Sequence, residues 1–174
     1  ENPNAPKHYP VEDISIEDLL GRGEIHLDQH EISSYISGKV IAVTGAGGSI
    51  GSELCRQIVK FKPKELLMID INENSLYMLE QEFNRDRMHG RIDKDIIIDS
   101  YIASIRDRGA IDSIFHNKKP EVVYHAAAHK HVPLMETRPM EAVKNNVFGT
   151  YNVVQCCIKN QVSRFIMISN DKAV

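Results

Sequence analysis

The sequence of 174 residues lacks any apolar run long enough to cross a membrane. Its longest uncharged apolar runs, such as Val40 to Ala46, fall far short of the roughly 20 residues that a bilayer requires. A basic segment followed by an apolar one, which would mark a secretory signal, is also missing from its start. We therefore expect a cytoplasmic chain that is neither secreted nor membrane-spanning.

Cysteine is scarce as well. The three cysteines, Cys55, Cys156 and Cys157, form no CxxC pair. Two of them are adjacent within a helical pattern, where their side chains are badly placed to close a disulfide. We expect all three to be reduced thiols, in keeping with a cytoplasmic location.

A large excess of charge of one sign is also absent. The net charge of −3 is unevenly spread, because residues 1–37 carry eight acids and two bases whereas residues 38–174 carry sixteen acids and nineteen bases. This small basic surplus excludes a nucleic-acid-binding surface, although it suits a small anionic ligand. With 42% hydrophobic and 26% charged residues, the composition is that of a soluble globular domain and excludes disorder, collagen-like repeats and coiled coils.

The acidic first part differs in pattern from the rest. Residues 1–10 contain three prolines and no periodicity, so we expect an extended linker there. Short helical patterns follow at 16–20 and 32–36. We interpret residues 1–37 as a linker and a helical collar on the main domain, which occupies residues 38–174.

In the main domain, short apolar runs alternate with amphipathic stretches. This alternation is typical of βαβ units, in which parallel strands are covered by helices on both faces. Right-handed crossovers then favour an α/β fold of the Rossmann type, a doubly wound parallel sheet with the strand order 3-2-1-4-5. The five predicted strands are 40–44, 66–70, 95–99 with a continuation to 102, 122–125 and 165–169.

The amphipathic stretches place apolar residues at helical spacing, and we expect each apolar stripe to pack against the sheet. The stripes are Ile50, Leu54, Ile58 and Phe61; Leu76, Leu79 and Phe83; Ile111, Ile114 and Phe115; and Val143, Val147, Tyr151, Val154 and Ile158.

A glycine-rich turn connects the first predicted strand to the first helix. The run Thr44 to Gly51 has the pattern TGxxGxxG, with four glycines in its last seven residues. Gly45 permits a sharp turn, Gly48 leaves backbone amides open to a pyrophosphate, and Gly51 lets the helix pack close to the strand. Because a helix N-terminus presents free donors and a partial positive charge, we expect a dinucleotide to bind here. A plain β-to-α turn is the alternative.

A carboxylate follows at the end of the second predicted strand. Asp70 stands 19 residues beyond Gly51, where dinucleotide-binding folds place the acid that binds the adenosine ribose. Its charge would repel a 2′-phosphate, and residues 71–74 supply no arginine to offset that repulsion. The pattern therefore favours NAD over NADP, while an ordinary turn residue at a strand end is the alternative.

The fourth predicted strand ends in an unusual segment. Ala126, Ala127 and Ala128 are small enough for a dinucleotide to pass closely, and polar side chains follow them. The run His129 to His131 has no Cys or carboxylate at ligand spacing, so we expect no metal there. A solvated loop is the alternative interpretation.

After the fifth predicted strand, Asp171 and Lys172 place an acid next to a base. Such a pair at the mouth of a cofactor cleft suits proton transfer to and from a sugar or an alcohol. Lysine acts as a base only where burial or a neighbouring cation lowers its pKa. An ordinary exposed pair is the alternative.

Five stretches of the sequence carry a family resemblance: IEDLLGR at 16–22, TGAGGSIGSELCRQI at 44–58, HAAAHKHVPLME at 125–136, NNVFGT at 145–150 and ISNDKAV at 168–174. Together they closely resemble the polysaccharide-biosynthesis branch of the extended short-chain dehydrogenase/reductase superfamily, and within it the membrane-anchored nucleotide-sugar 4,6-dehydratases. The resemblance implies tightly held NAD or NADP, a substrate such as UDP-N-acetylglucosamine, and a 4-keto-6-deoxy sugar for capsules, O-antigens or glycans. It also implies a homo-oligomer, anchored to the cytoplasmic face of the inner membrane by N-terminal helices that precede this sequence.

The resemblance further implies a mechanism and a set of site residues. Hydride leaves sugar C4, water is eliminated across C5 and C6, and hydride returns to C6. Asp171 would protonate the departing 6-hydroxyl, Lys172 would be the base at C5, and Asn146 would hold the active-site loop and its water. The catalytic set is Asp171, Lys172 and Asn170; the substrate set is Lys130, His131 and Val132; and the cofactor set is Gly45, Gly47, Gly48, Ser49, Ile50, Gly51, Asp70, Ile71, Ala126, Ala127, Ala128, Asn146, Ser169 and Lys172.

The sequence departs from the family at two places. Asn170 stands where a threonine is frequent, which removes a hydroxyl group that could bind the sugar. Ala103 and Ser104 stand where a Gly-Asp pair is common, which leaves the adenine contact without its acid. We expect residues 38–174 to be the NAD(P)-binding domain of a longer 4,6-dehydratase, inactive without its carboxyl-terminal part and substrate domain. The alternatives are a UDP-sugar 4-epimerase and a non-catalytic dinucleotide-binding module.

Overall fold

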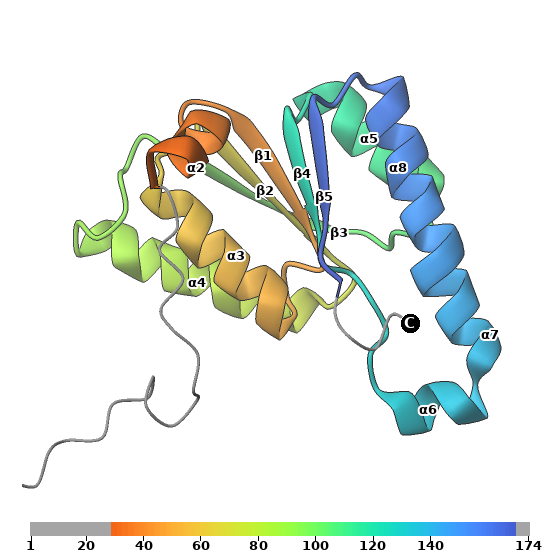
Figure 1. The fold of residues 1–174 in the computed structure, drawn as a ribbon. Coiled ribbons are helices and arrows are strands. Elements are labelled where there is room, and N and C mark those ends of the chain that lie inside the picture. The colour runs from red at the N-terminus through yellow and green to blue at the C-terminus, as the bar shows by residue number, and fades with distance from the viewer. Residues whose placement is uncertain (1–28, 170–174) are drawn as a thin grey trace, which may run out of the picture.

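The chain folds around a five-stranded parallel sheet. The structure, a computed structural model, describes residues 29–169. The strands lie in the order β3-β2-β1-β4-β5, as predicted, and every neighbouring pair is parallel. Figure 1 shows that their carboxyl ends point to the same edge of the sheet. The strands are β1 (Val40–Thr44), β2 (Glu65–Asp70), β3 (Ile97–Ile102), β4 (Val122–His125) and β5 (Arg164–Met167).

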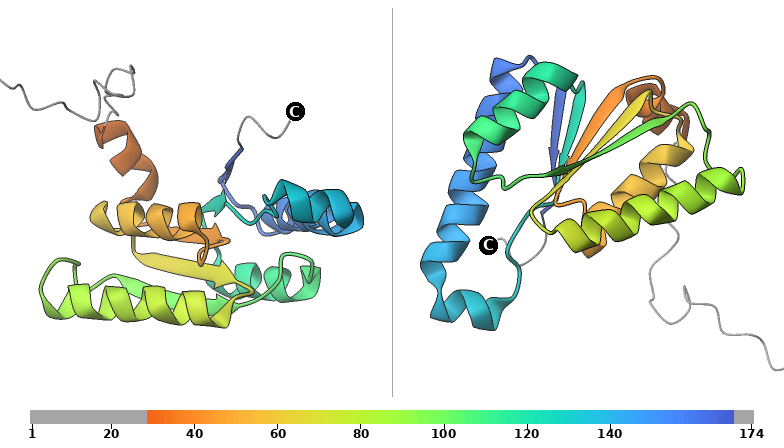
Figure 2. Two further views of the ribbon diagram at one scale, coloured as in Figure 1. Left: turned by 90° about the horizontal axis from the view of Figure 1, so that it is seen from below. Right: turned by 180° about the vertical axis from the view of Figure 1, so that it is seen from behind.

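Helices cover both faces of this sheet and give the molecule three layers (Figure 2). On one face lie α2 (Gln29–Ile36), α3 (Ser49–Lys60) and α4 (Glu73–Met88), and on the other lie α5 (Arg108–Lys118) and α8 (Thr150–Lys159). Between β4 and α8 the chain forms α6 (Val132–Thr137), α7 (Pro139–Ala142) and a π-helix, η1 (Val143–Gly149). Within residues 29–169, no helix has the length and apolar character needed to span a membrane.

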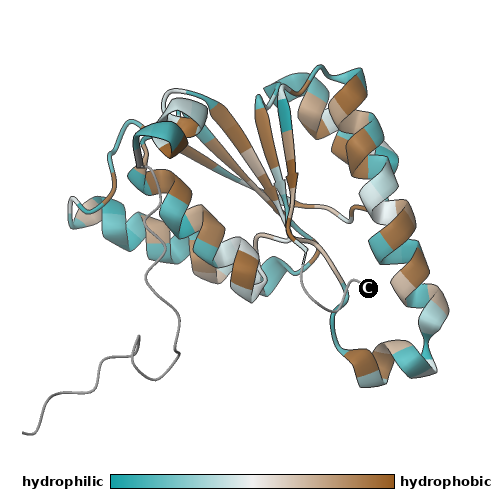
Figure 3. Ribbon diagram, viewed as in Figure 1, coloured by the Kyte–Doolittle hydropathy of each residue, from teal (hydrophilic) through white to brown (hydrophobic). Residues whose placement is uncertain are grey.

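The strands separate two apolar cores, because successive side chains of a strand point to opposite faces. Ile41 and Val43 of β1 pack with residues of α3 and α4, whereas Val40 and Ala42 pack with residues of α5 and α8. All five residues of β1 are buried, and Figure 3 shows apolar residues along the central strands. Burial on both faces explains why these strands are continuously apolar in sequence instead of alternating.

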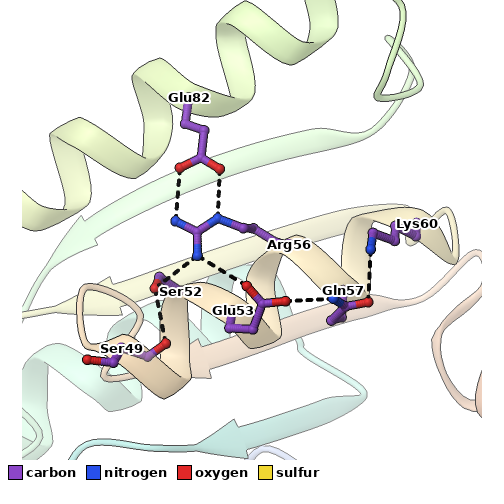
Figure 4. A network of polar contacts seen from close by, with 7 residues as sticks. All are labelled: Ser49, Ser52, Glu53, Arg56, Gln57, Lys60 and Glu82. Atoms are coloured by element: carbon purple, nitrogen blue, oxygen red, sulfur yellow. Dashed lines mark hydrogen bonds and ion pairs between the residues drawn. The ribbon is translucent and has the colours of Figure 1, made fainter. Parts of the chain in front are cut away.

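An ion pair joins the two long helices on the first face. Arg56 of α3 donates from Nε to Glu82 Oε1 at 2.7 Å and from Nη2 to Glu82 Oε2 at 2.9 Å (Figure 4). The same guanidinium also donates to Ser52 and Glu53 of its own helix. Because both partners are partly exposed, we expect the pair to stabilise the fold by at most about 1 kcal/mol.

Helix α2 occupies the second of the two helical patterns in residues 1–37. Ile36 is buried, and Ile32 and Tyr35 pack against the first core. The guanidinium carbon of Arg164 lies 3.7 Å from the centre of the Tyr35 ring, in a cation–π contact that ties α2 to β5. The predicted helical pattern at 16–20 and the linker at 1–10 lie outside the described residues.

Four strand limits differ from the prediction. β2 and β5 each begin one residue earlier than predicted, at Glu65 and Arg164, and two further limits differ by two residues. β3 begins at Ile97 and not at residue 95, because Asp93 closes a turn by accepting the amide of Asp95 at 3.1 Å. β5 ends at Met167 and not at residue 169, because its partner strand β4 ends at His125, opposite Met167.

The apolar stripe predicted for the last helix was wrong. Val147, Tyr151 and Ile158 are 57%, 57% and 67% exposed. A second apolar stripe, led by Val153, faces the sheet in their place and includes the two adjacent cysteines. Gly149, the last residue of η1, packs closely against Ile105, because a Cβ at this position would lie 2.7 Å from Ile105 Cδ1. Val153 follows four residues later and therefore lies on the same side of the helix.

The other stripes are buried as predicted, with one exception. Ile50 is 54% exposed, because it stands in the first turn of α3, beside the glycine turn and not beneath the sheet. Leu54, Phe61 and Ile114 are partly buried, and the fully buried members are Ile58, Leu76, Leu79, Phe83, Ile111 and Phe115.

Candidate functional site

Two glycines shape the turn between β1 and α3 because side chains would not fit there. Gly45 has a φ of +73°, a left-handed conformation, and a Cβ at this position would lie 2.6 Å from the amide nitrogen of Ala127. At Gly51 a Cβ would overlap the carbonyl oxygen of Gly45. Helix α3 therefore starts directly behind β1, and the loop after β4 passes close to the turn.

The start of α3 is exposed and has no side-chain cap. Its N-cap residue, Gly48, has an extended backbone and no side chain to accept hydrogen bonds from the amides of the first turn. Gly48, Ser49 and Ile50 are all exposed. Free amides at the positive end of a helix are the arrangement that binds phosphate groups in α/β proteins.

The carboxylate of Asp70, at the end of β2, faces the glycine turn. Its Oδ2 accepts a hydrogen bond from the amide of Gly47 at 2.9 Å, and its Oδ1 accepts one from the amide of Asn72 at 2.8 Å. A Cβ at Gly47 would lie 2.6 Å from Ser75 Cβ and 3.2 Å from Asp70 Oδ2. The glycine at position 47 therefore allows α4 and Asp70 to sit against the turn.

A hollow of about 450 Å³ opens beside the glycine turn and Asp70. It lies at the carboxyl edge of the sheet, where open α/β sheets bind ligands. The hollow is lined by Gly45, Gly48 and residues 69–71 on one side, and by residues 103–106, 126–129, Glu141 and Asn145 on the other.

A second hollow, of about 500 Å³, lies on the other side of the loop after β4. Residues 126–129 line both hollows. The second hollow is completed by His125, Lys130, three residues of α6 (Val132, Met135 and Glu136), Ala142, Asn146, Thr150 and residues 167–169.

Asn146 of the π-helix clamps the loop that the two hollows share. Its Oδ1 accepts from the amide of His129 at 2.8 Å, and its Nδ2 donates to the carbonyl oxygen of His129 at 2.9 Å. Asn145 donates to the same Oδ1 at 3.0 Å and so fixes the orientation of the Asn146 amide. The wide turn of a π-helix, a feature frequent at functional sites, brings both asparagines to this loop.

A buried histidine holds the base of the same loop. His125 Nδ1 is hydrogen-bonded to Thr44 Oγ1 at 2.6 Å, and His125 Nε2 to Thr150 Oγ1 at 2.9 Å. Burial lowers the pKa of His125 to about 4, so the imidazole is neutral at physiological pH. The neutral ring therefore connects the ends of β1 and β4 to the start of α8.

The structure brings most of the predicted site residues together at this edge. Gly45, Gly48, Asp70 and Ile71 line the first hollow, Ala126, Ala127 and Ala128 line both, and Asn146, Ser169, Lys130 and Val132 line the second. Gly47, Ser49, Ile50 and Gly51 belong to the turn and the start of α3 but line neither hollow, and the predicted substrate residue His131 lines neither hollow. Asn170, Asp171 and Lys172 lie outside the described residues.

Several lining residues were missed by sequence reasoning. Arg106 follows the end of β3 closely, so the rule that ligands bind beyond strand ends could have found it. Met135 and Glu136 end the stretch HAAAHKHVPLME, so the family resemblance covers them, but neither was predicted as a site residue. Glu141 lies on α7, and no local pattern in the sequence marks it. In residues 29–169, no three His, Cys, Asp or Glu side chains gather where they could hold a metal ion.

A family model described as "Polysaccharide biosynthesis protein" matches residues 41–174. The chain belongs to this family. Among its relatives, it is 49% identical to the probable polysaccharide biosynthesis protein EpsC of Bacillus subtilis and 46% identical to the capsular polysaccharide biosynthesis protein CapD of Staphylococcus aureus. These matches cover 94% and 92% of this chain but only 27% and 26% of the two relatives, so the chain spans about a quarter of their length.

A third relative is named for the reaction that it catalyses. The UDP-N-acetylglucosamine 4,6-dehydratase (inverting) of Campylobacter jejuni is 31% identical over 79% of this chain and 38% of its own length. Among solved structures, Pen from Bacillus thuringiensis matches with a TM-score of 0.71 and 30% identity over 80% of this chain and 41% of that one. The UDP-glucose 4-epimerase of Bifidobacterium longum, solved with NAD+ and UDP, has a TM-score of 0.62 and 20% identity over 76% of this chain and 37% of that one, and it shows the shared fold alone.

Proposed function

We propose that this chain is the NAD(P)-binding part of a UDP-N-acetylhexosamine 4,6-dehydratase, which makes a UDP-4-keto-6-deoxy sugar for capsule, O-antigen or glycan biosynthesis. Family membership and the similarity to the Campylobacter jejuni dehydratase support the reaction class. The observation that carries the proposal is the pair of hollows that share residues 126–129. A dinucleotide has two separate ends joined by a pyrophosphate, and this arrangement offers a place to each.

The residues present fit such a cofactor. Each hollow has a volume in the range of about 300–1,000 Å³ that ligand pockets usually have. The uncapped start of α3 would hold the pyrophosphate, Asp70 would accept hydrogen bonds from the adenosine ribose, and the first hollow would take the adenine. The nicotinamide would then lie in the second hollow, near Ser169.

The chemistry divides between the cofactor and this chain. A bound nicotinamide supplies the hydride acceptor and donor for sugar C4 and C6. We propose that Lys172 removes the C5 proton, which a ketone at C4 makes acidic, and that Asp171 protonates the 6-hydroxyl as it leaves as water. Both residues follow Ser169 closely in the sequence, and Ser169 lines the second hollow. Lys130 and Val132 line the same hollow and would contact the UDP-sugar.

The position of Asp70 favours NAD over NADP. Both of its oxygens accept backbone amides, so its negative charge stays beside the place of the ribose. Two like charges about 4 Å apart near a protein surface repel by about 4 kcal/mol, and 1.4 kcal/mol already changes affinity tenfold. Calorimetric titration of the chain should therefore give at least roughly tenfold tighter binding of NAD. Tighter binding of NADP would reverse this preference, and binding of neither would overturn the cofactor proposal.

The reaction itself is tested in a complete enzyme that contains this sequence. Incubation with UDP-N-acetylglucosamine should give a product lighter by one water in the mass spectrum. A 4-epimerase would leave the mass unchanged, so an unchanged mass together with a new C4 stereoisomer would overturn the dehydratase assignment. In D2O, Lys172→Met should abolish deuterium incorporation at C5, and undiminished incorporation would contradict the role of Lys172 as the base.

A further inference from the structure

An ion pair joins two of the segments that line the first hollow. Arg106, in the loop between β3 and α5, reaches Glu141 of α7, which lies 35 residues further along the chain. Its Nη1 donates to Glu141 Oε2 at 2.6 Å, and its Nη2 donates to the carbonyl oxygen of Glu141 at 3.1 Å. Nη2 also lies 3.3 Å from His129 Nε2. One guanidinium therefore connects three of the segments that line this hollow.

The loop that carries Arg106 is fixed on its own side. The side chain of Asn152 on α8 donates to the carbonyl oxygens of Ile105 and Arg106 at 3.2 and 3.1 Å. The amide of Arg106 donates to Ser104 Oγ at 3.2 Å, and Ile105 packs into the space that Gly149 leaves free. The loop is thereby attached to α8, and the Arg106 guanidinium links it to α7.

Glu141 is paired with two cations, Arg106 and Lys144, but only Arg106 comes from a distant segment of the hollow's lining. Lys144 of η1 donates to Glu141 Oε1 at 3.0 Å and lies three residues along the same helical stretch. Hydrogen bonds from Arg106 and from Lys144 lower the pKa of the Glu141 carboxyl, which keeps it ionised at neutral pH. The contact with Arg106 is therefore the one that joins separate segments of the lining.

The position of α7 affects both hollows. Helix α7 continues directly into η1, where Asn146 clamps the backbone of His129. His129 lines both hollows and its ring touches Arg106. A shift of α7 would therefore change the shape of the first hollow. It would also move the loop at residues 126–129, which lines both hollows.

We propose that Arg106 and Glu141 are positioning residues that hold the lining of the adenosine half of the cofactor site, so that dinucleotide affinity depends on their ion pair. The inference builds on the proposed NAD(P) site. It requires the contact between the two side chains, and it does not require either of them to touch the ligand.

A second ion pair in the chain provides a matched control. Arg56 and Glu82 have the same chemistry and a similar exposure, with side chains 37% and 31% exposed compared with 34% and 42% for Arg106 and Glu141. This pair also joins two separate elements, α3 and α4, as Figure 4 shows, but lines neither hollow. The substitution Arg56→Gln therefore removes a comparable contact away from the site.

The test is calorimetric titration with ADP-ribose, which contains the adenosine, the pyrophosphate and a ribose. Arg106→Gln and Glu141→Gln should each weaken binding by roughly threefold to fivefold, because a charge-assisted contact between two of the segments that line the hollow is lost. Arg56→Gln and Lys144→Gln should bind within about twofold of the wild-type chain. Circular dichroism and thermal unfolding of each variant establish that it is folded.

The variant Glu141→Gln shows whether Arg106 positions the lining of the hollow or binds the ligand directly. If Arg106 bound the ligand itself, Glu141→Gln would free the guanidinium, so unchanged or tighter binding by that variant would overturn the proposal. The double variant should bind no more weakly than Arg106→Gln, because that variant already lacks the contacts of the guanidinium with both the side chain and the carbonyl oxygen of Glu141. Additive losses would show that the two side chains act separately and would also overturn it.

Three further outcomes complete the test. Where Arg106→Gln does not fold, Arg106→Lys retains the charge without the planar fork and should bind with intermediate affinity, and wild-type affinity of that variant would overturn the inference. A wild-type chain that fails to bind ADP-ribose would overturn the proposed function and the inference with it. Binding by the wild type together with equal binding by Arg106→Gln and Glu141→Gln would overturn the inference alone.

Discussion

Replacing Gly45 by alanine should reveal how closely the loop after β4 approaches the glycine turn. Gly45 has a φ of +73°, and a Cβ there would lie 2.6 Å from Ala127 N and 2.7 Å from Ala126 C. Gly90 has nearly the same φ, +69°, but nothing lies within 4 Å of a Cβ placed on it. The variant Gly90→Ala therefore measures the conformational cost alone, whereas Gly45→Ala measures that cost together with the overlap.

The expected magnitudes follow from these two geometries. A left-handed alanine costs about 1 kcal/mol relative to glycine, and this cost applies to both variants. At Gly45 the overlapping atoms belong to the backbone and cannot rotate away, so the loop itself has to shift. Overpacking of this kind costs about 1–3 kcal/mol. We expect Gly90→Ala to lower the free energy of unfolding by about 1 kcal/mol, and Gly45→Ala by about 2–4 kcal/mol.

Urea unfolding followed by circular dichroism gives both values. Titration with ADP-ribose provides a second readout. In Gly45→Ala, a shift of residues 126–129 would deform both hollows, which these residues line. In Gly90→Ala we expect no such shift, so both hollows should stay intact. We expect weaker binding by the first variant and wild-type binding by the second. Equal losses of unfolding free energy in the two variants would refute the close approach of the loop to Gly45.

Two more predictions concern side chains that hold the same loop. Burial lowers the pKa of His125 to about 4 in the folded chain, whereas a histidine of the unfolded chain has a pKa near 6.5. As the pH falls, the unfolded chain therefore binds this proton first, and it is stabilised relative to the folded chain. The free energy of unfolding from this group should fall by about 2 kcal/mol between pH 7 and pH 5. In urea unfolding at the two pH values, His125→Gln should lack this part of the pH dependence, whereas His116→Gln, a change at an exposed histidine, should retain it. An equal pH dependence in the two variants would contradict a buried, neutral His125 ring. Asn146→Ala removes both hydrogen bonds to the backbone of His129 and should destabilise the chain by about 1–2 kcal/mol and weaken NAD binding, and unchanged affinity in calorimetry would contradict the clamp.

The strand order could be predicted because it depends on local patterns and on one chiral rule. Strands buried on both faces are continuously apolar, and right-handed crossovers between them leave the order that the structure has. The buried face of α8 could not be predicted in this way, because the stripes that start at Tyr151 and Val153 are both apolar at helical spacing. The buried stripe is the one on the side where Gly149 packs closely against Ile105, and such a tertiary contact cannot be read from the periodicity of the helix.

In the candidate site too, local sequence patterns predict some residues, whereas others depend on tertiary contacts. The glycine turn, Asp70 and the three alanines after β4 each follow a strand directly, so the rule that open α/β sheets bind ligands beyond their strand ends predicts them. Arg106 obeys the same rule, but its partner Glu141 lies within a long crossover, where only the fold brings it to the hollow. If cofactor affinity depends on this pair, the strand ends determine where the dinucleotide binds, while a contact between β3–α5 and α7 determines how tightly its adenosine end is enclosed.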